Sequence, residues 1–270
     1  MNKGAVLGLV IALMIPLSCY FIMKQVGEHA VDMPRHYYLD TVITSEKDGK
    51  VQTDTQWHRI RNFTLTDQLG QPFSLDSVKG KIVIVNSFFT RCPNICPALT
   101  RNIRELQASF ENPKNKKYDD TSSIQFISLS VDPERDSVSN LKQFADRFNV
   151  NSDNWRMLTG NKKEIYDILL NEIKIPSQDG GVVDSNFIHS GRVILLDKNH
   201  VLRGYYDGLD SAAMYSLAQD IGKLVLEKDK NKPSIFREYL PILPLLAMVP
   251  LIVLVLMLIL SRQRKKLEGL

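Results

Sequence analysis

Residues 81–97 read KIVIVNSFFTRCPNICP, an apolar, β-branched half followed by two cysteines. The first half is typical of a buried central strand over 82–88, and the apolar spacing over 99–110 predicts a helix after it. Cys92 and Cys96 therefore lie on the turn from strand to helix, on one helix face because they are four residues apart. Two thiols in this position can hold a soft metal ion or close a disulfide.

The start of a helix suits reactive sulfur. It carries partial positive charge, which favours the thiolate, the form that binds metal or attacks a disulfide. Pro93 suits the first helical position, because the amide hydrogen that proline lacks would have no partner there. We expect both sulfurs to point the same way from this first turn.

Strand and helix patterns alternate through the middle of the chain. A hairpin over 63–75, turning at Gly70, precedes the cysteine strand. The other expected elements are strands over 124–131, 155–158, 192–197 and 201–206 and helices over 137–148, 162–173 and 211–227. A βαβ start, a late hairpin and a closing helix, with two cysteines after the first central strand, predict a thioredoxin-like α/β domain.

Two apolar runs near the ends predict transmembrane helices in this 270-residue chain. Residues 5–23 contain no charged side chain and would be about 28 Å long as a helix, enough to cross a bilayer. Residues 239–260 form a second such run, followed by four basic residues within 262–266, whereas only Arg237 closely precedes it. By the positive-inside rule both termini are cytoplasmic, and the central domain lies on the outer, periplasmic side of the cell (inner) membrane.

The first apolar run has two alternative interpretations. A cleaved signal peptide would have a shorter apolar region, and residues 27–30 make a poor small-x-small cleavage site. Cys19 would suit a lipoprotein, but the residues before it lack the usual leucine three positions upstream. We therefore interpret Cys19 as an inert membrane residue, while cleavage of the first run stays open.

The expected organisation has six parts. They are an N-terminal transmembrane anchor at 1–23, a linker at 24–57, the thioredoxin-like domain at 58–228, a linker at 229–238, a C-terminal transmembrane helix at 239–260 and a basic cytoplasmic tail at 261–270. The first linker is polar and aperiodic, which indicates a tether, and its His29 and His36 are interpreted as solvated side chains.

The net charge of +4 does not indicate a nucleic-acid partner. Residues 58–228 hold 22 lysines and arginines against 21 aspartates and glutamates, so the domain itself is close to neutral. The excess comes largely from the tail, where it orients the second apolar run in the membrane.

A third metal ligand is needed, because two thiolates rarely complete a stable protein copper site. His189 is the candidate, since it stands at a strand end in the loop that approaches the cysteine helix in a thioredoxin-like topology. Two cysteines and one histidine form a soft trigonal set suited to Cu(I). Zinc usually needs a fourth ligand, and no other cysteine lies outside the apolar runs.

Several motifs together resemble one protein family. They are residues 63–67 with Gly70, Gly80-Lys81, residues 89–97, residues 130–136, His189-Ser190 and residues 205–210. Over residues 60–226 the chain resembles the Sco/SenC family, membrane-anchored copper chaperones with a thioredoxin-like domain that assist assembly of the copper A centre of cytochrome c oxidase. The resemblance implies that Cys92, Cys96 and His189 bind copper and that the two cysteines can also form a disulfide.

The chain departs from the family pattern in three places. Ile188 stands where many relatives have an acidic or amide residue before the ligand histidine, and Asn94 stands where aspartate is frequent. Neither change removes a ligand, so only the local charge, the affinity and the redox poise are affected. The second span departs from the usual single anchor and would hold the domain close to the membrane at both ends.

The resulting hypothesis is a copper chaperone without turnover chemistry. Reduced Cys92 and Cys96 take up Cu(I) or Cu(II) with His189 and pass it to the copper A subunit of cytochrome c oxidase, and a thiol reductant keeps the pair reduced. The alternative is a membrane-tethered thiol-disulfide reductase with Cys92 attacking and Cys96 resolving, which does not need the histidine. A peroxidase would rely on Thr90 and Arg91, which match that class only weakly.

Other polar and soft side chains have structural explanations. Four aspartates are expected in turns and helix caps and two methionines in the core. They are Asp132, Asp136, Asp207, Asp210, Met157 and Met214.

Overall fold

The strand before the cysteines, β5 (Ile82–Phe88), lies inside a sheet in the computed structural model, which describes residues 18, 32–47, 50–111, 123–174 and 191–227. Every residue of β5 is buried. It pairs in parallel with β6 (Ile124–Ser130) and antiparallel with β8 (Arg192–Leu196). The prediction of a buried central strand over 82–88 is confirmed.

Seven strands form the main sheet, in the order β4-β3-β7-β6-β5-β8-β9. The remaining members are β3 (Thr64–Asp67), β4 (Pro72–Ser74), β7 (Trp155–Thr159) and β9 (Leu202–Asp207). The three central strands β5, β6 and β7 are parallel, and the outer strands pair antiparallel on both sides. The carboxyl ends of the parallel strands therefore meet at one edge of the sheet, which is where such folds bind ligands.

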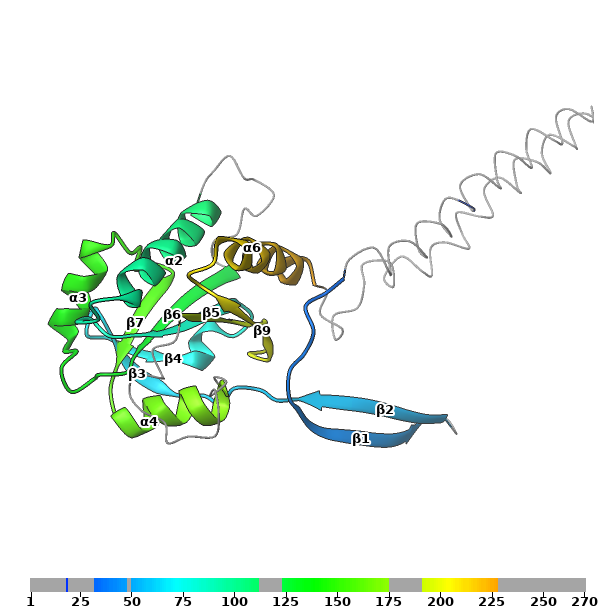
Figure 1. Ribbon diagram of the computed structural model, residues 1–270. Coiled ribbons are helices and arrows are strands. Elements are labelled where there is room, and N and C mark those ends of the chain that lie inside the picture. The colour runs from blue at the N-terminus through cyan, green and yellow to red at the C-terminus, as the bar shows by residue number, and fades with distance from the viewer. Residues whose placement is uncertain (1–17, 19–31, 48–49, 112–122, 175–190, 228–270) are drawn as a thin grey trace, which may run out of the picture. The chain divides into compact units, whose positions relative to one another are not determined.

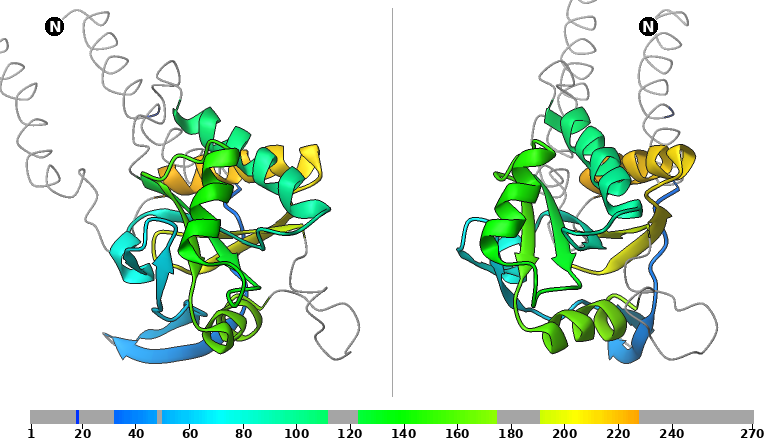
Figure 2. Two further views of the ribbon diagram at one scale, coloured as in Figure 1. Left: turned by 90° about the vertical axis from the view of Figure 1, so that its left-hand side faces the viewer. Right: turned by 60° about the vertical axis from the view of Figure 1, so that its left-hand side comes forward.

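Helices cover both faces of this sheet (Figures 1 and 2). Helices α2 (Ile95–Glu111), α3 (Val138–Arg147) and α6 (Ser211–Leu226) share one apolar core with the even-numbered residues of β5. The odd-numbered residues of β5 pack in a second core with α4 (Lys162–Asp167) and the π-helical turn that continues it (Ile168–Glu172). This is the mixed, thioredoxin-like α/β architecture that the sequence predicts.

The helix after the cysteines begins at Ile95, so Pro93 is not its first residue as predicted. The backbone amide of Cys96 donates a hydrogen bond to Cys92 Sγ at 3.5 Å, so the sulfur occupies the place of a capping acceptor. Pro93 and Asn94 lie in the bend between the two cysteines. Pro97 instead falls in the first helical turn, where its missing amide hydrogen costs nothing.

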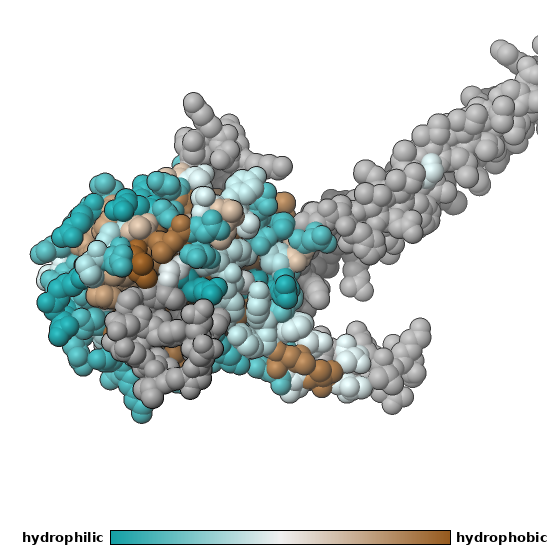
Figure 3. Space-filling view, viewed as in Figure 1, coloured by the Kyte–Doolittle hydropathy of each residue, from teal (hydrophilic) through white to brown (hydrophobic). Residues whose placement is uncertain are grey.

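A β-hairpin replaces the expected tether over part of residues 24–57. Strands β1 (Leu39–Lys47) and β2 (Lys50–Trp57) pair antiparallel as a separate two-stranded sheet, so the interpretation of this stretch as wholly irregular was wrong. Apolar periodicity could not reveal it, because β1 is exposed along its described length and both of its faces mix apolar and polar residues. Figure 3 shows the apolar surface that the hairpin leaves exposed.

The base of the hairpin is attached to the domain. Arg203 of β9 donates two hydrogen bonds to the carbonyl of Pro34, at 2.7 and 3.1 Å, and the amide of Tyr37 donates to Leu202 O at 3.2 Å. His36 stacks on Trp57 with ring centroids 4.9 Å apart, so it is packed rather than solvated as expected.

The two expected transmembrane helices fall on residues 5–23 and 239–260, which lie outside the described ranges except for Ser18. His29 and the strand end expected before His189 lie outside them as well. Among the helices that the structure does describe, none combines the length and apolar character required to cross a bilayer.

Candidate metal centre

The two cysteines lie together at the carboxyl end of β5. Both are free thiols, with Cys92 7 % and Cys96 1 % exposed. The amide of Cys92 donates to Phe89 O at 3.2 Å, which closes the turn, and the two thiols hydrogen-bond each other. The hydrogen bond between the two thiols agrees with the expectation that both sulfurs point the same way.

The two thiols differ in acidity because their surroundings differ. Burial acts to raise the pKa of Cys92, but hydrogen bonds from the backbone amides of Cys96, Asn94 and Ile95 outweigh it and lower that pKa below its ordinary value. Burial raises the pKa of Cys96 to about 12, against a lowering hydrogen bond from the amide of Phe89. Cys92 is therefore the nucleophilic sulfur at neutral pH, and Cys96 is a buried thiol that must lose its proton when a metal binds.

We expect iodoacetamide to modify Cys92 long before Cys96 in the reduced, metal-free chain. With a pKa of about 12, only about 1 in 10⁵ of the Cys96 population is thiolate at pH 7, because each pH unit changes that ratio tenfold. The modification rate of Cys92 should rise with pH, with a midpoint below that of an ordinary cysteine. Peptide mass spectrometry measures both rates, and unfolding in urea should make them equal. Equal rates in the folded chain would contradict the assignment.

A buried carboxylate lies beneath the cysteine turn. Asp136 follows β6 and is 1 % exposed, and it accepts hydrogen bonds from Thr90 and Ser130. Its place before α3 predicts a helix cap, but Ser137 caps this helix instead, by accepting from the amide of Asn140. Sequence periodicity could not reveal this role, since Thr90 and Asp136 are 46 residues apart.

The chain returns to this same edge of the sheet at β8. The pair between β5 and β8 that lies nearest the cysteine turn joins Asn86 to Val193, so the chain before Arg192 leaves the sheet where β5 continues into that turn. Gly191 O accepts from the amide of Gly208 at 2.7 Å. Gly208 in turn packs against the side chain of Leu99, one helical turn after Cys96. Gly191 is therefore held close to the first turns of α2.

Gly208→Ala should disturb both stability and the cysteine region. A Cβ at this position would lie 2.2 Å from Leu99 Cδ1, 2.7 Å from Val193 Cγ2 and 3.0 Å from Gly191 O, so α2 or the β8–β9 end must move. We expect a loss of about 1–3 kcal/mol in the free energy of unfolding, the usual cost of overpacking, with a changed rate of Cys92 alkylation. Gly80→Ala is the control, because it strains a left-handed backbone at the far end of β5 and should leave that rate unchanged.

His189, the predicted third ligand, lies outside the described residues, two positions before Gly191. Within the ranges that the structure describes, no group of three histidine, cysteine, aspartate or glutamate side chains is placed to hold a metal ion. The described part of the site is therefore the dithiol and the turn that carries it.

The other candidate residues lie where structural roles predict. Asp210 caps α6 by accepting from the amides of Ala212 and Ala213, and Asp207 accepts from the amide of Leu209 in a turn. Asp132 accepts backbone hydrogen bonds through its carbonyl in the turn before α3. Met157 is 1 % exposed and Met214 packs half-buried against the same core. None of these five residues is needed to explain the dithiol.

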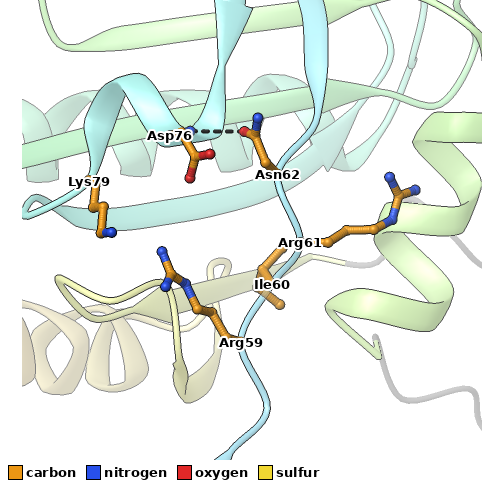
Figure 4. A pocket seen from close by; sticks show the side chains of 6 residues that line it. All are labelled: Arg59, Ile60, Arg61, Asn62, Asp76 and Lys79. Carbon is orange, nitrogen blue, oxygen red and sulfur yellow. Dashed lines mark hydrogen bonds between the residues drawn. The ribbon is translucent and has the colours of Figure 1, made fainter.

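A polar hollow of about 590 Å³ lies at the opposite end of β5, beside the residues that precede it (Figure 4). Arg59 and Lys79 point into it, whereas Arg61 points away toward α4, where it pairs with Asp167 at 2.6 Å and Glu172 at 3.2 Å. The hollow is separated from the cysteine turn by the length of β5 and contains no thiol.

The fold and the turn define a thioredoxin-like dithiol protein, in which three residues rather than two separate the cysteines at the start of the helix. Residues 51–225 match the SCO1/SenC family, and the chain belongs to that family.

Individual relatives agree with this assignment. The chain is 29 % identical over 176 residues to the SCO1 protein homolog of Bacillus subtilis, covering 64 % of this chain and 86 % of that one. It is 27 % identical over 148 residues, 54 % of this chain and 68 % of the other, to a protein of Stutzerimonas stutzeri whose name designates it as copper-binding. The solved structure of BsSco, described as a Sco family cytochrome c oxidase assembly protein with a disulfide switch, superposes with TM-score 0.52 at 27 % identity, covering 63 % and 95 % of the chains.

Proposed function

We propose that this protein is a membrane-anchored copper chaperone that binds one copper ion through Cys92, Cys96 and His189 and delivers it to the copper A site of cytochrome c oxidase. Copper is its cargo, as the copper-binding relative indicates, and oxidase assembly is its setting, as the description of BsSco indicates. The observation that carries the proposal is the pair of buried thiols at the start of α2, joined by the hydrogen bond from the Cys96 amide to Cys92 Sγ, with Gly191 held close to the first turns of that helix.

The donor set fits copper. Two thiolates are soft ligands that select Cu(I), and an imidazole is acceptable to both Cu(I) and Cu(II). Cys92 has the lower pKa of the two thiols, so it can make the first bond, and Cys96 follows by giving up its proton. Gly191 is held near α2, and at about 3.4 Å per residue His189 can be no more than about 7 Å along the chain from it.

The transfer step is a ligand exchange rather than turnover chemistry. A thiolate of the acceptor subunit replaces one ligand at a time, so the copper is never released to water. The unequal pKa values of the two thiols suit this stepwise exchange. Cys96 has the higher pKa, so a proton replaces copper on Cys96 more readily than on Cys92.

The membrane placement is part of the same proposal. We propose two spans, at 5–23 and 239–260, with both termini cytoplasmic and the domain between them on the periplasmic side, on the strength of the apolar runs and the basic tail. A thiol reductant on that side would keep the cysteines able to bind metal. Protease protection of sealed vesicles tests the arrangement, and a domain found on the cytoplasmic side would overturn it.

A thiol-disulfide reductase is the second candidate, because a lowered pKa on the first cysteine and a buried second cysteine also suit a nucleophile and its resolving partner. The two functions differ in their need for His189. A reductase does not require that imidazole, whereas a trigonal copper site does.

His189→Ala is therefore expected to weaken copper binding while leaving the dithiol able to form a disulfide. We expect a loss in Cu(I) affinity larger than the roughly 10–100-fold that removal of an outer-shell partner costs. Competition with a chromophoric Cu(I) chelator measures the affinity of the full-length chain. His36→Ala is the matched control, because this imidazole packs on Trp57 at the hairpin base. Equal copper affinity in the wild type and His189→Ala would favour the reductase.

A further inference from the structure

Asp136 is a buried carboxylate with an unusual set of partners. Its Oδ1 accepts from Thr90 Oγ1 at 2.5 Å and its Oδ2 accepts from Ser130 Oγ at 2.6 Å. The backbone amide of Thr90 also points between the two oxygens, at 3.3 and 3.2 Å. Both carboxylate oxygens are thus fully engaged by neutral donors.

Asp136 differs from the other buried aspartates of the described residues in its hydrogen-bond partners. In the described part of the chain three aspartates are buried, and two of them, Asp67 and Asp197, pair with Arg156 and Arg203 at 3.0 and 3.1 Å. Asp136 receives only hydroxyl and amide hydrogens there. A buried charge without a cation is expensive, so a carboxylate at this position calls for an explanation beyond general stability.

The donors of Asp136 belong to the cysteine turn. Thr90 lies between Phe89 and Cys92. The amide of Phe89 hydrogen-bonds the Cys96 sulfur, and the carbonyl of Phe89 accepts from the amide of Cys92. Two successive amides of this turn therefore point at different acceptors, one at a ligand sulfur and the next at Asp136. The Thr90 N–H and the Phe89 carbonyl belong to one planar peptide unit, so fixing the Thr90 amide also fixes the carbonyl that accepts from the amide of Cys92.

From this arrangement we infer that Asp136 is a positioning residue for the dithiol, which acts through Thr90 to hold Cys92 and Cys96 in the relative placement that one metal ion requires. The inference rests on the proposed copper function for its purpose, but its geometry does not depend on copper. An asparagine would place its NH₂ group at the position of Oδ1 or Oδ2, beside the Thr90 backbone amide that points between the two oxygens. The Thr90 and Ser130 hydroxyls can turn to accept from this NH₂ group, but the Thr90 amide can only donate, so its hydrogen bond would weaken and the turn would shift.

A double-mutant cycle tests whether Asp136 acts through Thr90. The variants are Asp136→Asn, Thr90→Val and the double variant, made in the full-length chain with Cys19→Ser so that only the two site cysteines respond. The first readout is metal-free, namely the equilibrium in which the Cys92–Cys96 disulfide and two glutathione thiols give the dithiol and glutathione disulfide. The second readout is Cu(I) affinity by chelator competition.

We expect each single variant to change both readouts, and outer-shell changes of this kind typically cost about 10–100-fold in metal affinity. The effect of Asp136→Asn should be smaller in the Thr90→Val background, because the hydroxyl hydrogen bond that transmits part of it is already gone. The charge of the carboxylate and its hydrogen bonds from the Thr90 backbone amide act in both backgrounds and so do not contribute to the coupling. Asp67→Asn, another buried carboxylate, should lower stability and leave both readouts unchanged.

Two results would overturn the inference. One is independent effects, in which the double variant loses the product of the two single changes. The other is an equal effect of Asp67→Asn, which would mean that general destabilisation moves the readouts. Should Asp136→Asn fail to fold, Ser130→Ala takes its place in the cycle, since it removes only one of the hydrogen bonds to the carboxylate. If the wild type binds no copper, the proposed function fails, while the glutathione equilibrium still decides the role of Asp136.

Discussion

Cys92→Ser is expected to abolish tight copper binding. The substitution removes one of the two proposed soft ligands, and a serine hydroxyl is neither soft nor ionised at neutral pH. It also removes the sulfur whose pKa the turn lowers, while the serine oxygen can still accept from the Cys96 amide and cap α2. The remaining thiol is the one with a pKa of about 12, which competes poorly for metal against protons.

Copper stoichiometry of the full-length chain, purified under reducing conditions, measures this effect. We expect one copper per wild-type chain and essentially none per Cys92→Ser chain at micromolar free copper. Cys19→Ser is the matched control, because it removes a thiol of the N-terminal apolar run and should leave one copper bound. Retention of copper by Cys92→Ser, or its loss in Cys19→Ser, would show that the metal is held elsewhere.

Arg203→Met should cause the largest loss of stability among single substitutions outside the cysteine turn. Arg203 is 2 % exposed and donates to Asp197 Oδ2 at 3.1 Å and to the carbonyl of Pro34. Methionine leaves the buried Asp197 without its cation and the Pro34 carbonyl without this donor. Breaking a buried ion pair in this way typically costs about 3–5 kcal/mol.

Urea unfolding followed by tryptophan fluorescence can measure the change, since Trp155 is fully buried in the core. Arg135→Met is the control, because Arg135 forms an exposed ion pair with Asp132 at 3.5 Å, and such surface pairs contribute at most about 1 kcal/mol. An equal shift of the unfolding midpoint for both variants would contradict the assigned role of Arg203.

The parts of this protein that sequence could predict are those that local patterns determine. The strand over 82–88 and the helix cap at Ser137 were predictable because apolar periodicity and capping preference act over a few residues. The cysteine pair was predictable for the same reason, since its spacing and its place between strand and helix are both local. The approach of the 189–191 region to the pair followed from topology, and the structure supports it as far as Gly191.

What sequence could not predict depends on distant partners. The bond between Asp136 and Thr90 joins segments 46 residues apart, and a short aspartate before a helix looks like a cap until its partner is known. The hairpin over 39–57 could not be predicted from apolar periodicity, because neither of its faces is consistently apolar. The helix begins at Ile95 rather than at Pro93 as predicted. The acceptor at its start is the Cys92 sulfur, which accepts from the Cys96 amide, rather than one of the usual capping oxygens.

The bond from Arg203 to Pro34 also limits how far the domain could move from a bilayer, if residues 5–23 anchor the chain as proposed. A free stretch from 24 to 57 would extend to roughly 115 Å over its 34 residues, but the chain is already fixed to β9 at Pro34. Only ten residues separate the end of the first apolar run from Pro34, which is about 35 Å at full extension. Such an anchor would restrict copper transfer to an acceptor close to the lipid surface.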